Sequence, residues 1–212
     1  MPAPQLTDLL QAAFDARQPL IERLHGEDTN AYRLFNGSTE NWPGLNVDRY
    51  GDLLLIQTFH EPLDGHDRVA VENFYAAALP GLVAVYNDRS RANSRIANPL
   101  PAEVLAEAQK PREFHEMGVR YLVQGRHAGQ DPWLFLDLRA GRRRVMQEAA
   151  GKSVLNLFAY TCGVGIAAAK VVEPRALWRD MRQIGAVQIA DRQFAEHIIQ
   201  DRGRVLDRIV AL

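Results

Sequence analysis

The chain has 212 residues, of which 47% are hydrophobic and 24% charged, a balance that excludes disorder as the main state. A net charge of −1 argues against a generally basic coat for nucleic acid. No apolar run approaches the roughly 20 residues that span a membrane, and the first residues show no secretory signal. The single cysteine, Cys162, excludes a disulfide within the chain. We therefore expect a cytoplasmic protein without a membrane partner.

Apolar residues at three- and four-residue steps predict a helix over residues 6–24, which Pro19 should break or kink. The period then changes to that of short strands separated by turn sequences such as Asn36-Gly37. The expected strands cover residues 32–35, 44–47, 53–59 and 82–86, and a helix over 66–78 precedes the last of them.

The second half of the chain predicts a hairpin over residues 113–124 that turns near Met117-Gly118. An arginine-rich helix over 137–150, a strand over 152–158 and a helix over 164–170 follow. The expected fold class is α+β, and a boundary near Pro111 divides it. Residues 1–112 form a mixed α/β module in this interpretation, and residues 113–212 form a second domain.

The segment from Val154 to Gly165 carries the clearest chemical signal. A buried strand enters a turn that contains Gly163 and Gly165, and a helix follows, so that backbone N–H groups can face a ligand. The turn lacks the Gly-Lys-Ser/Thr of a phosphate-binding loop and is not a full G-x-G-x-x-G. A nucleotide-like ligand and a plain structural turn therefore remain alternatives at this point.

Four stretches, in order, resemble one family. Lys152 to Ala169 is similar to the first motif of class I S-adenosylmethionine-dependent methyltransferases, and more narrowly to the ribosomal RNA large-subunit methyltransferase I and K group. Arg33 to Gln57, with its Pro-Gly-Leu-x-Val-Asp-Arg-Tyr-Gly-Asp core, resembles the middle domain of that group. Glu113 to Val123 resembles its linking hairpin, and Leu134 to Arg139 resembles its F-L-D-Q-R motif. The resemblance implies that residues 113–212 begin a Rossmann-like domain that binds S-adenosylmethionine.

The resemblance also implies roles for individual residues. Asn156 takes the place of the acidic residue that ends the first strand in other methyltransferases. The remaining implied cofactor-binding residues are Phe135, Asp137, Arg139, Phe158, Ala159, Tyr160, Thr161 and Gly163. Asp137 can accept from the cofactor amine or cap the following helix, and both alternatives stay open. Arg139 can bind the cofactor carboxylate or an RNA phosphate. No catalytic residue is identified.

The arginine-rich helix is a candidate RNA surface. Arg139, Arg142, Arg143 and Arg144 form a local positive cluster that can neutralise RNA phosphates, or that simply solvates a helix face. Cys162 lies in the cofactor turn, so we interpret it as a packing residue rather than a nucleophile. The six histidines show no metal-ligand spacing, so no metal site is expected.

The resemblance visible in the motifs stops near Lys170. No Asp-Pro-Pro motif occurs, and neither Glu173 nor Asp180 has the apolar strand context of a ribose-binding carboxylate. We therefore expect a chain that is truncated or frameshifted after about residue 170. The predicted function is S-adenosylmethionine-dependent methylation of RNA, at a base of large-subunit rRNA. The alternative is an inactive fragment that at most binds RNA or cofactor weakly. RNA is the expected partner, and a homodimer is one open alternative.

Overall fold

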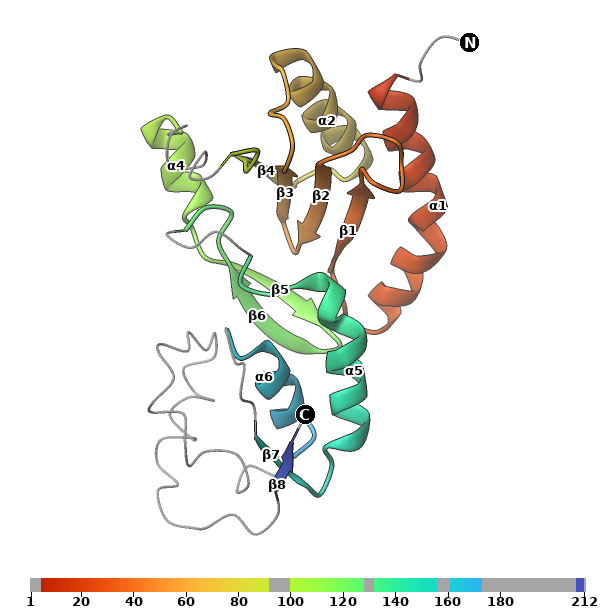
Figure 1. Ribbon diagram of the computed structural model, residues 1–212, viewed down its shortest axis with the longest axis vertical. Coiled ribbons are helices and arrows are strands. Elements are labelled where there is room, and N and C mark those ends of the chain that lie inside the picture. Colours follow the sequence, from red (N-terminus) through yellow and green to blue (C-terminus); the bar gives the residue numbers. More distant parts are fainter. Residues whose placement is uncertain (1–4, 92–99, 128–131, 156–160, 173–208, 212) are drawn as a thin grey trace. The chain divides into compact units, whose positions relative to one another are not determined.

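The computed structural model describes residues 5–91, 100–127, 132–155, 161–172 and 209–211 (Figure 1). The chain divides into two compact units. The first unit comprises Met1–Gly118 and Val123–Asp131, and the second comprises Val119–Leu122 and Pro132–Leu212. Within the described ranges, no helix combines the length and the apolar character that crossing a membrane requires.

The first unit is built on a four-stranded sheet with strand order β1-β2-β3-β4. The first three strands are antiparallel neighbours, and β4 runs parallel to β3 after a crossover through a helix. These elements are β1 (Ala31–Asn36), β2 (Leu45–Tyr50), β3 (Leu53–Thr58), α2 (Gly65–Ala78) and β4 (Val83–Asp88). The four strands and the crossover helix predicted from the sequence are confirmed.

Helices α1 (Leu6–Gly26) and α2 share one apolar core with the sheet (Figure 1). Leu10, Leu54 and Val71 are fully buried in that core. A break or kink was predicted at Pro19. The break is wrong, because α1 runs through the proline without interruption, and the kink stays a prediction. A proline removes one backbone hydrogen bond. Burial of Ile21 beyond the proline outweighs that loss by tying the last turns to the core.

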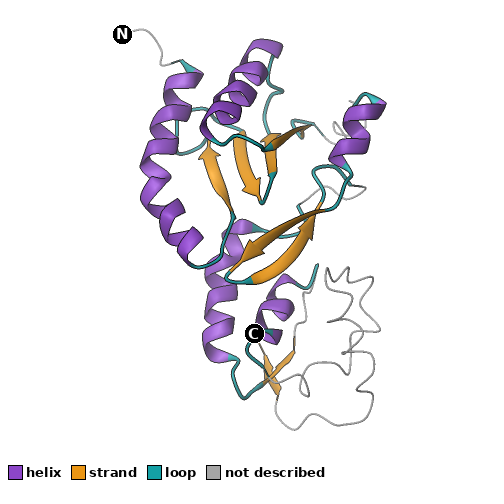
Figure 2. Ribbon diagram, turned by 180° about the vertical axis from the view of Figure 1, so that it is seen from behind, coloured by secondary structure: helices purple, strands orange, loops and turns teal. Residues whose placement is uncertain are grey.

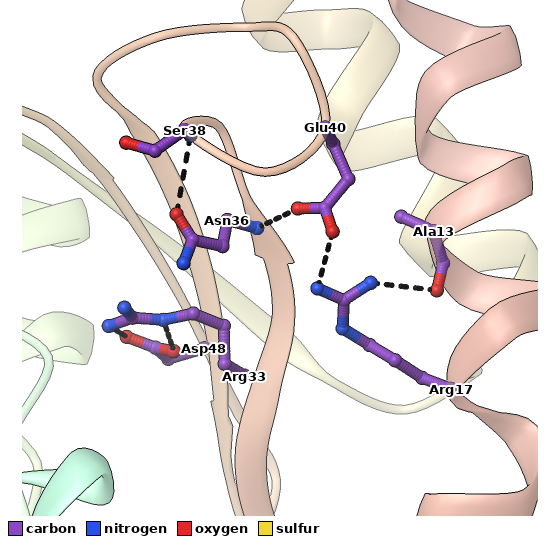
Figure 3. A network of polar contacts seen from close by, with 7 residues as sticks. All are labelled: Ala13, Arg17, Arg33, Asn36, Ser38, Glu40 and Asp48. Atoms are coloured by element: carbon purple, nitrogen blue, oxygen red, sulfur yellow. Dashed lines mark hydrogen bonds and ion pairs between the residues drawn. The ribbon is translucent and has the colours of Figure 1, made fainter.

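Charged side chains connect helix α1 and the first two strands of the sheet (Figure 3). Arg17 of α1 binds Glu40 at 2.7 Å, and the second oxygen of Glu40 accepts from the backbone N–H of Asn36 at 2.5 Å. Arg33 of β1 donates two hydrogen bonds to the buried Asp48 of β2, at 2.8 and 3.0 Å. These pairs join α1 to the β1–β2 turn and β1 to β2, so their role is structural.

The hairpin of β5 (Arg112–Glu116) and β6 (Val119–Val123) turns at Met117 and Gly118, whose φ angles are 52° and 68°. The turn predicted at Met117-Gly118 is confirmed. Gly51, with φ of 61°, lies so close to the Glu113 carbonyl that a Cβ would overlap it. This glycine therefore lets β5 approach the β2–β3 turn. A short helix, α4 (Ala102–Ala108), was not predicted.

The second unit contains a 3-10 turn, η1 (Leu136–Leu138), followed by α5 (Arg139–Glu148), β7 (Ser153–Leu155), α6 (Gly163–Ala169) and β8 (Ile209–Ala211). Strand β7 pairs in parallel with β8. Helices α5 and α6 lie side by side (Figure 2), and Val145, Ala149, Ala168 and Val172 form their shared core. Strand β7 and helix α6 follow one another as predicted, and the α+β class is confirmed. The glycines predicted in the turn, Gly163 and Gly165, lie instead in the first turn of α6.

Candidate cofactor-binding site

Five of the nine predicted cofactor-binding residues lie in the described part of the chain, and all five belong to the second unit. They are Phe135, Asp137, Arg139, Thr161 and Gly163. The other four, Asn156, Phe158, Ala159 and Tyr160, lie outside the described residues. The candidate site is therefore built from two segments, residues 133–139, which end at the first residue of α5, and residues 161–163, which end at the first residue of α6.

Two contacts bring these segments together. The Thr161 hydroxyl donates a hydrogen bond to the Trp133 carbonyl. Gly163 packs against the buried side chain of Leu134, and a Cβ at Gly163 would lie less than 3.0 Å from its Cδ1 atom. Separate motifs of the sequence thus meet at the turn that precedes α6. Glycine at position 163 allows the close approach.

Tyr121 is a further part of this site that sequence reasoning missed. It is buried, and its hydroxyl donates to the Gly163 carbonyl at 3.5 Å. The one signal in the sequence was the apolar alternation of β6, which puts Tyr121 on the buried side of the hairpin. Gly163 therefore packs against Leu134, and its carbonyl accepts a hydrogen bond from Tyr121.

Cys162 immediately precedes α6 with a left-handed backbone, at φ of 60°. Its side chain is buried, and burial raises the pKa of the thiol. A thiol with a raised pKa stays protonated at neutral pH and is a poor nucleophile. The interpretation of Cys162 as a packing residue fits this geometry.

Residues 135–139 are the other group of predicted cofactor-binding positions. Phe135 and Arg139 are half-buried and Asp137 is exposed in η1. The alternative that Asp137 caps α5 is wrong, because the N-cap position belongs to Leu138 and no side chain caps the helix. The 3-10 turn shifts the helix start by two residues and leaves the Asp137 carboxylate available to a ligand amine.

The predicted arginine cluster is only partly on the surface. Arg144 is exposed and pairs with Glu148, but Arg142 is 1% exposed and cannot reach an RNA phosphate. Val145 and Ala149 follow Arg142 at helical spacing and are buried with it, so they define the inner face of α5. The prediction that Arg142 contacts RNA is therefore wrong.

Among the described residues, one group has the geometry of a candidate metal site. Asp64, His66 and Asp67 bring their ligand atoms within 4.8 Å of one another at the start of α2. Asp64 already caps that helix, accepting from the Asp67 N–H at 2.7 Å. Capping of α2 explains the acidic Asp64 at this position without a metal ion. The expected lack of a metal site stays a prediction.

Comparison with known proteins gives consistent matches. The S-adenosylmethionine-dependent methyltransferase family matches residues 32–206. A ribosomal RNA large subunit methyltransferase of Deinococcus radiodurans is 31% identical, over 88% of this chain and 46% of its own length. The large subunit methyltransferase I of Aeromonas salmonicida is 27% identical, over 95% of this chain and 54% of its own. The chain thus spans about half the length of these curated relatives.

A solved structure with a similar fold supports the family match. A protein described as a methyltransferase, crystallised with S-adenosylhomocysteine, aligns with a TM-score of 0.60 and 29% identity, over 77% of this chain and 40% of that chain. The family match continues past Lys170, where the motifs legible in the sequence end. It favours the methyltransferase interpretation over the inactive fragment. Glu173 and Asp180 lie outside the described residues, and the expected truncation stays a prediction.

Proposed function

The chain belongs to the S-adenosylmethionine-dependent methyltransferase family, and we propose that its second unit binds S-adenosylmethionine for methyl transfer to a base of large-subunit ribosomal RNA. The observation that carries the proposal is the meeting of residues 133–135 with residues 161–163. Two motifs that the family resemblance assigns to the cofactor lie together in the fold, although 25 residues separate them along the chain.

The described residues suit the methionine half of the cofactor. Asp137 is exposed in η1 and can accept a hydrogen bond from the cofactor amine, and Arg139 can bind the carboxylate in a bidentate manner. The four residues at 156 and 158–160 complete the proposed site. Methyl transfer is a displacement at the sulfonium carbon, so holding the two reactants in line supplies much of the rate acceleration.

RNA as the substrate rests on two supports. The curated relatives are named as ribosomal RNA large subunit methyltransferases. Arg143 and Arg144 lie on α5 outside its buried face and can contact phosphates. We assign residues 1–112 to a module resembling the family's middle domain and residues 113–212 to the cofactor domain. A homodimer and a cytoplasmic location stay predictions.

Photo-crosslinking with methyl-labelled S-adenosylmethionine tests the binding half of the proposal. Label should appear in peptides that contain residues 133–139 or 156–165, and an excess of S-adenosylhomocysteine should remove it. Label confined to the first unit would contradict the site.

A methyl-transfer assay with protein-free large-subunit rRNA tests the substrate. Tritium incorporated into RNA, and abolished by S-adenosylhomocysteine, is the expected result. Crosslinking at the site without any transfer to that RNA would refute the substrate and leave the cofactor assignment standing.

A further inference from the structure

The described part of the second unit buries an arginine side chain. Arg142 is 1% exposed and is the largest of the fully buried side chains in the described residues. Moving a charged group out of water is unfavourable unless polar partners replace the lost hydration. An apolar residue of similar volume often stabilises a fold at least as well. Core packing alone therefore does not explain an arginine at this position.

The contacts of Arg142 point to the cofactor site. Its Nη1 atom donates to the Phe135 carbonyl at 2.9 Å. Its Cδ atom lies 4.0 Å from the position that a Cβ would take at Gly163, so the Arg142 stem lies near the start of α6. The side chain thus binds the first segment of the site, and its stem lies near the second, from helix α5, which begins at the last residue of the first segment.

We propose that Arg142 is a positioning residue for cofactor binding. It holds the Phe135 carbonyl in place, and this fixes the start of η1 and with it the direction in which Asp137 and Arg139 project. The guanidinium suits the role because it has five N–H donors in a rigid plane. This inference rests on the proposed function, because it assigns a role within that cofactor site.

Calorimetric titration of S-adenosylhomocysteine into three full-length variants tests the proposal. Arg142→Met keeps an unbranched apolar stem but removes the donors. Arg142→Lys keeps the charge and one donor group. Arg120→Met is the matched control, because Arg120 is an exposed arginine of the second unit on β6. The wild-type chain provides the reference affinity and the number of binding sites.

We expect Arg142→Met to weaken binding by roughly tenfold or more, because hydrogen bonds to charged groups are among the stronger ones. Arg142→Lys should recover part of the loss, and Arg120→Met should bind like the wild type. The number of sites per chain should stay unchanged in all variants. A merely structural role would instead lower the number of sites, through unfolded molecules, at constant affinity.

Three results would overturn the inference. They are wild-type affinity in Arg142→Met, fewer sites at constant affinity in both Arg142 variants, or the same loss in the Arg120→Met control. Failure of the wild-type chain to bind S-adenosylhomocysteine would overturn the proposed function, and this inference with it. Unchanged affinity in Arg142→Met would remove the inference alone.

Discussion

Replacing Gly163 by alanine should reveal how closely the two segments of the site are packed. The new methyl group would lie less than 3.0 Å from Leu134 Cδ1, against about 3.5–4.0 Å for a favourable carbon–carbon contact. Leu134 is buried, so it has little room to retreat. Gly141 of α5 is the matched control, because a Cβ there meets nothing within 4 Å.

Comparing helix propensity with overpacking predicts whether each glycine substitution stabilises or destabilises the second unit. Glycine to alanine within a helix is favourable by up to about 1 kcal/mol, and Gly141→Ala should show that gain. Overpacking a buried contact costs about 1–3 kcal/mol, so Gly163→Ala should be destabilising by about 1 kcal/mol on balance. Leu134→Ala alone should cost about 2–5 kcal/mol. In the double variant the new methyl fills part of that cavity, so its loss should be about 1–3 kcal/mol smaller than the sum.

Hydrogen exchange of α5 and α6 peptides measures the opening free energy of the second unit separately from that of the first. The four variants complete a double-mutant cycle with its control. Additive effects of Gly163→Ala and Leu134→Ala, or equal gains at Gly141 and Gly163, would refute the packing of these segments against each other.

Three further predictions concern charge and backbone conformation. The His115 ring donates hydrogen bonds to the carboxylates of Asp28 and Glu113, and these raise its pKa above the ordinary 6.5. Its stabilisation of the first unit is therefore full below pH 6.5 and is lost as the pH rises through the raised pKa, and thermal unfolding of His115→Gln should lack this decline. Gly51→Ala should destabilise the first unit by at least about 1–2 kcal/mol in urea unfolding, because it combines a positive φ with overlap at the Glu113 carbonyl. Joint replacement of Arg143 and Arg144 by glutamate should flatten the salt dependence of RNA binding by about 0.7 for each phosphate that the variant no longer neutralises, and identical filter-binding slopes would exclude α5 as an RNA surface.

Much of the first unit was predictable from local pattern. Residues 53–58 form a continuous run dominated by apolar residues, and β3 is buried at every position. The Met117-Gly118 turn was predictable because glycine readily adopts a positive φ. The continuity of α1 through Pro19 was not predictable from local pattern, because it depends on core contacts made after the proline.

The site was predictable in its motifs and not in its packing. Strand β7 and helix α6 follow from local sequence, whereas the exact start of α5 and of α6 does not. The burial of Arg142 was not predicted, because arginines three and four residues apart resemble an exposed stripe on a helix surface. The helical spacing between Arg142 and the buried Val145 and Ala149 indicates instead that Arg142 lies on the inner face of the helix. Tyr121 was missed because its contact with Gly163 joins residues 42 apart in sequence.

Binding of S-adenosylhomocysteine, measured by calorimetry, tests the central claim most directly. The wild-type chain should bind one molecule, and Gly163→Val should abolish binding because its side chain overlaps Leu134 at the turn. Gly141→Val, at an exposed glycine of α5, should leave the affinity unchanged. Equal affinity for the wild type and Gly163→Val would contradict the assignment of this turn as the cofactor site.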